Sequence, residues 1–83
     1  MLGVGRTVKT LPKAWSEFLV NKPETGMDYQ VVAVTLRDGR KVEDVAIIHS
    51  SIIGEVRGYA DIPFDPCEIT GIELTHRKWQ FSR

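Results

Sequence analysis

The chain lacks most features that would link an 83-residue protein to a known chemistry. Its single cysteine, Cys67, cannot form an internal disulfide, and a lone thiol favours a reducing, cytoplasmic location. No run approaches the roughly 20 apolar residues of a membrane-spanning helix, and no continuous apolar segment near the start resembles a secretory signal. We therefore expect a soluble, unprocessed chain without a membrane partner.

Net charge is also lacking. Eleven basic and eleven acidic residues give a net charge of zero at pH 7, so no overall field attracts the chain to nucleic acid or to an anionic membrane. Basic residues still gather near the start, around the Asp38-Gly39 pair and at the end of the chain, with an acidic stretch from Asp61 to Glu73. A local basic patch is compatible with this distribution.

Motifs for catalysis and for cofactors are absent. The sequence has neither of the glycine-rich phosphate-binding patterns, and it lacks the short-spaced His and Cys pairs of zinc sites. His49, Cys67 and His76 would have to converge by folding alone to bind a metal. His49 precedes two serines, but no nucleophile elbow or oxyanion-hole motif accompanies them. We expect no enzyme activity, no catalytic residue, no cofactor and no metal site.

The length favours a single domain, residues 1–83, with a small core, because a chain of this size buries only about 60–65% of its unfolded surface. The sequence predicts three parts within it. Residues 1–9 form a mobile lead-in or a short edge strand, residues 10–22 a helix, and residues 28–82 an antiparallel β-sheet or barrel.

The helix is predicted from one apolar stripe with helical spacing. Thr10 is expected to cap its first amides and Pro12 to lie in its first turn, while Asn21 and Pro23 end it. Because so short a helix is marginal alone, its two aromatic residues are expected to dock on the sheet. The stripe consists of Leu11, Ala14, Trp15, Phe18 and Leu19.

A hairpin dominates the middle of the chain. Two β-branched runs, Tyr29–Leu36 and Lys41–Ile48, flank Asp38-Gly39, which predicts a two-residue type I′ turn with positive φ at both central positions. The alternation of the second run breaks at Glu43-Asp44, and one extra residue there, a β-bulge, returns Val45 and its neighbours to the core face. A bulge bends a strand, and bending is how small barrels close.

The second half of the chain continues in short elements. A third strand is predicted over Ile52–Val56 with a bend at Gly54. The proline-rich segment 62–67 reads as an ordered loop whose Ile62 and Phe64 plug a barrel end, with a tight turn at 65–68. Ile69–Thr75 and Lys78–Ser82 complete the strands.

The predicted fold is mainly β with one short N-terminal helix. About five strands form a small, strongly bent antiparallel sheet, as in an SH3-like or Sm-like barrel. The alternative is an α+β roll with the helix across an unclosed sheet.

One stretch resembles a known family. A helix followed by a bent sheet with Leu36-Arg37-Asp38-Gly39-Arg40 at its first turn is similar to the opening of an Sm-like domain, over Leu11 to Val45. The resemblance implies five strands after the helix and RNA binding. Sm-like proteins that bind RNA carry an aromatic-Asp pair and an Asn after the second strand, where this chain has residues 48–51. The Arg57-Gly58 pair arrives too soon after the first turn to match the later Arg-Gly of that family.

The predicted function is that of a non-enzymatic β-barrel interaction module that binds a protein partner or self-associates as a homo-oligomer. Edge strands of a small sheet offer unpaired amides and carbonyls that add a strand from another chain. Tyr29, Val31 and Tyr59 are the candidate exposed apolar contacts if the helix leaves that face of the sheet uncovered.

The alternative function is binding of RNA or single-stranded DNA through the basic and aromatic C-terminal strand, which requires a basic groove with stacking aromatic residues. In the competing interpretation, Trp79 and Phe81 are core residues of a closing strand, with solvated basic neighbours. The nucleic-acid candidates are Arg37, Arg40, Lys41, Arg77, Lys78 and Trp79.

Overall fold

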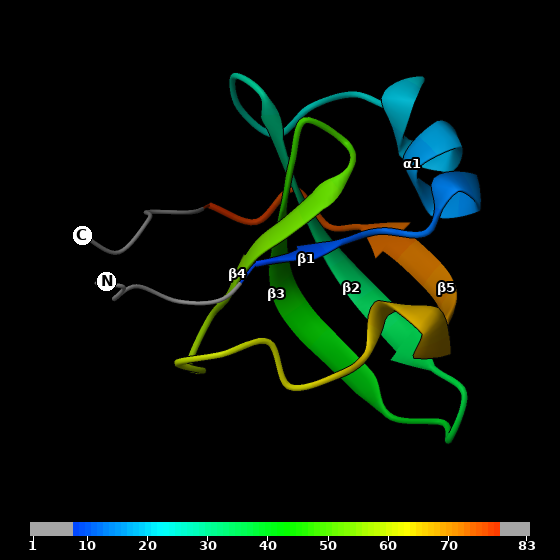
Figure 1. The fold of residues 1–83 in the computed structure, drawn as a ribbon. Coiled ribbons are helices and arrows are strands. Elements are labelled where there is room, and N and C mark those ends of the chain that lie inside the picture. The colour runs from blue at the N-terminus through cyan, green and yellow to red at the C-terminus, as the bar shows by residue number, and fades with distance from the viewer. Residues whose placement is uncertain (1–7, 79–83) are drawn as a thin grey trace, which may run out of the picture.

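The computed structural model describes residues 8–78, which contain five strands and one α-helix (Figure 1). All strand pairs are antiparallel, in the sheet order β1-β4-β3-β2-β5. The sheet curls into a half-barrel, which confirms the prediction of a mainly β fold with one short helix and a bent sheet. The elements are β1 (Lys9–Thr10), α1 (Lys13–Val20), β2 (Tyr29–Leu36), β3 (Lys41–Ile48), β4 (Ile52–Val56), the 3₁₀ turn η1 (Pro66–Glu68) and β5 (Ile69–Leu74).

The strands of the central hairpin begin and end where the sequence predicts, but the turn type was wrong. Only Gly39 has positive φ, at 94°, and its N–H donates to the Leu36 carbonyl at 2.9 Å. The Leu36 N–H in turn donates to the Arg40 carbonyl at 2.8 Å, which gives a three-residue loop closed by a left-handed glycine. Positive φ at both central turn positions occurs instead at His49 and Ser50, between β3 and β4.

Both predicted irregularities of the sheet are confirmed. Val32 pairs with Val45 but Val34 pairs with Val42, so β3 carries one extra residue in this interval, and Asp44 there has a φ of 56°. In β4 the extra residue is Gly54, where an added Cβ would lie 2.9 Å from Ile48 Cγ1.

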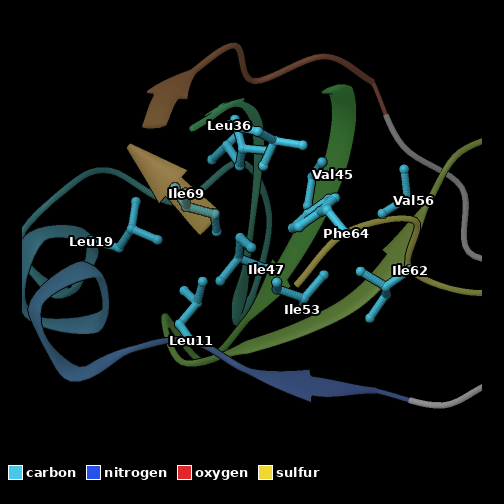
Figure 2. Close-up of a cluster of buried hydrophobic side chains, with 12 residues drawn as sticks. Leu11, Leu19, Leu36, Val45, Ile47, Ile53, Val56, Ile62, Phe64 and Ile69 are labelled. Carbon is cyan, nitrogen blue, oxygen red and sulfur yellow. The ribbon is translucent and has the colours of Figure 1, made fainter. Parts of the chain in front are cut away.

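The concave face of the sheet holds the core (Figure 2). Alternate residues of β2, β3 and β4 supply most of it, as period-two patterning requires. The loop before β5 closes one end with Ile62 and Phe64, which confirms the predicted plug. Asp65 accepts a hydrogen bond from Cys67 N–H at 2.9 Å, and this fixes the tight turn η1. The buried cluster is Leu11, Leu19, Val32, Val34, Leu36, Val45, Ile47, Ile53, Val56, Ile62, Phe64 and Ile69.

The helix is shorter than predicted and begins differently. Thr10 does not cap it, because Thr10 belongs to β1 and pairs with Ile52; Pro12 occupies the N-cap position instead. Docking of both aromatic residues was also wrong for Phe18, which is 38% exposed. Its ring meets the half-buried Trp15 edge-on, and Lys22 Nζ lies 4.7 Å from its centroid. The apolar stripe reaches the core through Leu11 and Leu19, which are buried in it, and through Trp15, which packs against it.

The C-terminal end of α1 is tied to the sheet by Gln30, the buried polar residue of β2. Its Nε2 donates to the carbonyl oxygens of Leu19, Lys22 and Pro23 at 3.1–3.2 Å, and its Oε1 accepts from Ser50 Oγ at 3.4 Å. Helix ends leave carbonyls without intrahelical partners, so one side chain provides what a C-cap motif otherwise would.

The last predicted strand, Lys78–Ser82, is not supported at Lys78, which lies outside any strand; residues 79–82 lie outside the described residues. The sheet gains its remaining strand, β1, at the other end of the chain, where a short edge strand was one of the two predictions for residues 1–9. Among residues 8–78, no helix is long and apolar enough to cross a membrane.

Candidate functional site

The longer edge of the half-barrel is β5, with six residues, whereas the opposite edge strand, β1, has two. The Thr75 N–H donates to the Val31 carbonyl at 3.0 Å, which extends the β2–β5 register by one pair. Because the N–H and C=O groups of successive residues point to opposite sides of an antiparallel strand, those of Gly71 and Glu73 point toward β2. Ile72 and Leu74 therefore direct their N–H and C=O groups away from the sheet.

Side chains on β5 follow the same alternation. Ile72 pairs with Val34 and Leu74 with Val32, so both lie on the concave face, packed against the core but only half-buried. Gly71 and Glu73 lie on the convex face. An edge strand with outward backbone groups and incompletely covered apolar side chains is suited to pairing with another strand.

The convex face is covered more than the sequence suggested. The expectation that Val31 is exposed was wrong, because its side chain is fully buried. Its N–H donates to Thr25 Oγ1 at 2.9 Å, and its carbonyl accepts from Thr75 and His76. Tyr29 is half-buried, and Tyr59, after β4, is 52% exposed.

Residues 75–78 run from the end of β5 across this face, behind β2 and β3 in Figure 1. Arg77 pairs with Glu43 at 3.0 Å and approaches Asp44 Oδ1 to 3.9 Å. The Arg57 guanidinium donates to the Lys78 carbonyl at 2.7 Å. Asp44 Oδ1 is buried without a hydrogen-bond donor, and the positive charge of Arg77, whose Nε lies 3.9 Å away, compensates its negative charge.

Most of the nucleic-acid candidates are engaged with acidic residues or carbonyls. Arg40 pairs with Asp38 at 2.9 Å and Lys41 with Glu73 at 3.3 Å, and Arg77 is paired as described above. Arg37 donates to a backbone carbonyl, that of Cys67, at 3.3 Å. Lys78 is exposed, and Trp79 lies outside the described residues. Three of the five described candidate cations therefore lie beside carboxylates, which opposes an open basic groove.

The hairpin turn contains a carboxyl group with a shifted pKa. The Arg40 backbone N–H donates to Asp38 Oδ1 at 3.0 Å, and the Arg40 side chain donates to Oδ2 at 2.9 Å. These hydrogen bonds favour the ionised form and lower the pKa of Asp38 below its ordinary value. The arrangement is that of a structural turn.

The histidines and the cysteine stay in separate places. His49 Nδ1 lies 3.9 Å from Asp28 Oδ1, His76 Nδ1 lies 2.7 Å from Thr25 Oγ1, and Cys67 is exposed. Within residues 8–78, no three His, Cys, Asp or Glu side chains gather as metal ligands.

Comparison of the chain with protein-family models, with curated proteins and with solved structures found no match. Function therefore has to be argued from the surface of the half-barrel. Sequence reasoning named edge strands as a class but missed Ile72 and Leu74. The available signal was their alternation with Glu73 in the final strand, which no later strand pairs in the described chain.

Proposed function

We propose that this chain is a non-enzymatic protein-interaction module that extends its sheet at β5 with a strand from another protein chain. The observation that supports the proposal is the outward direction of the backbone groups of Ile72 and Leu74 on a six-residue edge strand. Each unpaired N–H and C=O is a strong hydrogen-bonding group, so an added strand gains a ladder of backbone bonds. Self-association is the simplest form of such pairing.

The half-barrel also supports a finer assignment of fold. We propose that it is a small barrel of the SH3-like or Sm-like class, left open between β1 and β5, and that the chain works in the cytoplasm. The short strands, the bulge at Glu43-Asp44 and the bend at Gly54 are the features that curl the sheet.

Nucleic-acid binding through the basic residues is the weaker alternative. A stacking and electrostatic groove needs uncompensated cations, and Arg40, Lys41 and Arg77 each lie within 3.3 Å of a carboxylate oxygen. Binding to a mixed oligonucleotide pool at low salt, weakened by salt and by Arg77→Ala with Lys78→Ala, would favour this alternative.

Light scattering across a dilution series tests the proposal with the chain alone. The wild-type mass is expected to exceed that of one chain at high concentration and to fall on dilution. Ile72→Pro removes an outward N–H but leaves the backbone hydrogen bonds of Gly71 and Glu73 to β2, so this variant is expected to be monomeric. Ile72→Val, which keeps the N–H, is the matched control and should associate. A wild-type chain that has the mass of one molecule at every concentration contradicts self-association.

A further inference from the structure

We infer that the strand added to β5 is β5 of a second copy, paired antiparallel about a twofold axis through Ile72. This inference rests on the proposed function and specifies its partner and register. In an isologous pair of this kind, each contact occurs twice, so one residue must face its own equivalent. Only a few residues of β5 qualify for that place.

Backbone direction restricts the choice first. A hydrogen-bonded pair at the axis requires outward N–H and C=O groups, which Ile72 and Leu74 have. Leu74 is the last residue of β5, so an axis there would pair half of each strand with residues beyond the sheet. An axis at Ile72 aligns residues 70–74 of both copies.

The irregularity in β5 sets the other limit. Thr35 pairs with Gly71 and Leu36 with Ile69, so Thr70 is an extra residue that interrupts the ladder. An axis at Gly71 would place Ile69, a core residue, opposite Glu73, which lies on the convex face. The ladder is thus regular from Gly71 to Leu74, and Ile72 is the outward residue in this segment whose two neighbours, Gly71 and Glu73, also lie in it.

Repulsion between like charges disfavours an axis at Glu73 relative to one at Ile72. An axis at Glu73 places two carboxylates directly opposite each other, which is destabilising. With the axis at Ile72, Glu73 lies opposite Gly71 of the second copy, and each Glu73 keeps its pairing with Lys41 at 3.3 Å within its own chain.

Apolar contact across the axis fits the same register. Ile72 meets Ile72 of the second copy on the concave side, and Leu74 lies opposite Thr70 of the second copy. Both Ile72 and Leu74 are half-buried in the single chain, so this contact removes further apolar surface from water.

Cysteine cross-linking in the full chain, with Cys67→Ser as background, tests the register. Opposed residues of a hydrogen-bonded pair have Cα atoms about 5.5 Å apart, within disulfide range. Ile72→Cys is therefore expected to give a disulfide-linked dimer under mild oxidation with diamide. Residues 73 of the two copies are offset by two positions, with Cα atoms about 8 Å apart, beyond disulfide range. Glu73→Cys should cross-link at least about tenfold more slowly.

The outcomes distinguish this inference from the proposed function. Preferential cross-linking through Glu73→Cys, or no cross-linking of either variant in a chain that light scattering shows to be associated, overturns the register and leaves strand addition standing. No cross-linking in a chain that is monomeric at all concentrations overturns the inference together with the self-association form of the proposed function. Circular dichroism of each variant confirms that the fold is retained.

Discussion

Replacing Gln30 by leucine removes the side chain that joins the end of α1 to the sheet. The variant keeps a similar volume but loses the amide that donates to the carbonyls of Leu19, Lys22 and Pro23. Gln30 is 1% exposed, so water cannot easily replace it. Two amide protons make these bonds, each worth about 1 kcal/mol net. The Leu19 carbonyl still accepts from the Lys22 N–H at 2.9 Å, so the substitution does not leave it unpaired.

The loss of these bonds lowers the free energy of unfolding by about 1–3 kcal/mol, and the apolar gain of leucine offsets part of this loss. In a domain of this size, that corresponds to a fall in melting temperature of up to roughly 5–25 °C. Urea unfolding followed by circular dichroism measures it. A loss below about 0.5 kcal/mol would refute the role given to Gln30.

Gln30→Glu provides a pH test of the same site. A carboxylate cannot donate to carbonyls, whereas a protonated carboxyl can, so burial here favours the neutral form in the folded state. The folded chain then binds a proton more tightly than the unfolded chain, and stability is expected to rise as the pH falls. Relative to wild type, the defect of this variant should shrink toward acid pH, whereas the defect of Gln30→Leu should not.

Three further predictions concern the core, the β4 bend and the hairpin turn. Phe64→Ala should lower the free energy of unfolding by about 3–5 kcal/mol, whereas Tyr59→Ala, at an exposed position, should change it by less than about 0.5 kcal/mol. Urea titration compares the two variants, and equal effects would contradict the role of Phe64 in closing the end of the half-barrel. Gly54→Ala should destabilise because the new Cβ lies 2.9 Å from a neighbouring side chain, whereas Gly71→Ala meets only ordinary contacts at 3.8 Å and should be tolerated; thermal unfolding measures both, and the reverse order would contradict the geometry. A ¹³C NMR titration should give Asp38 a pKa below the ordinary pKa of an aspartate. The turn hydrogen bonds of Asp38 then add to stability at pH values above that ordinary pKa, and this contribution is lost as the pH falls through the lowered pKa. An ordinary pKa would contradict the turn geometry.

Local signals predicted the central strands well because side-chain alternation and turn residues act over short distances. The bounds of Tyr29–Leu36 and Lys41–Ile48 match the structure, and so does the bulge at Glu43-Asp44. The type of the turn was missed because Asp-Gly fits more than one loop, and the three-residue loop needs positive φ at Gly39 alone.

Long-range contacts account for the errors elsewhere. Thr10 is a good N-cap residue, but it pairs with Ile52 as part of β1, so the helix begins only at Lys13. Val31 reads as one residue of an exposed face, yet the segment after β5 is hydrogen-bonded to it and crosses that face. Such contacts join residues about 40 positions apart, and no sequence period encodes them.

The candidate site also depends on both local signals and long-range contacts. Sequence patterns identified the strand that begins at Ile69 but not the alternation of Ile72 and Leu74 within it. Which strand it pairs with, and hence which backbone groups remain outward, depends on the sheet order β1-β4-β3-β2-β5. The outward direction of Ile72 and Leu74 is therefore a property of the folded chain.

Amide hydrogen exchange measured by NMR over a concentration series tests strand addition at β5 most directly. The amides of Gly71 and Glu73, which face β2, are expected to be protected at every concentration. Those of Ile72 and Leu74 are expected to exchange rapidly in dilute samples and to become protected as the concentration rises. Rapid exchange of Ile72 and Leu74 at all concentrations, or protection of both in a single chain, would contradict the account.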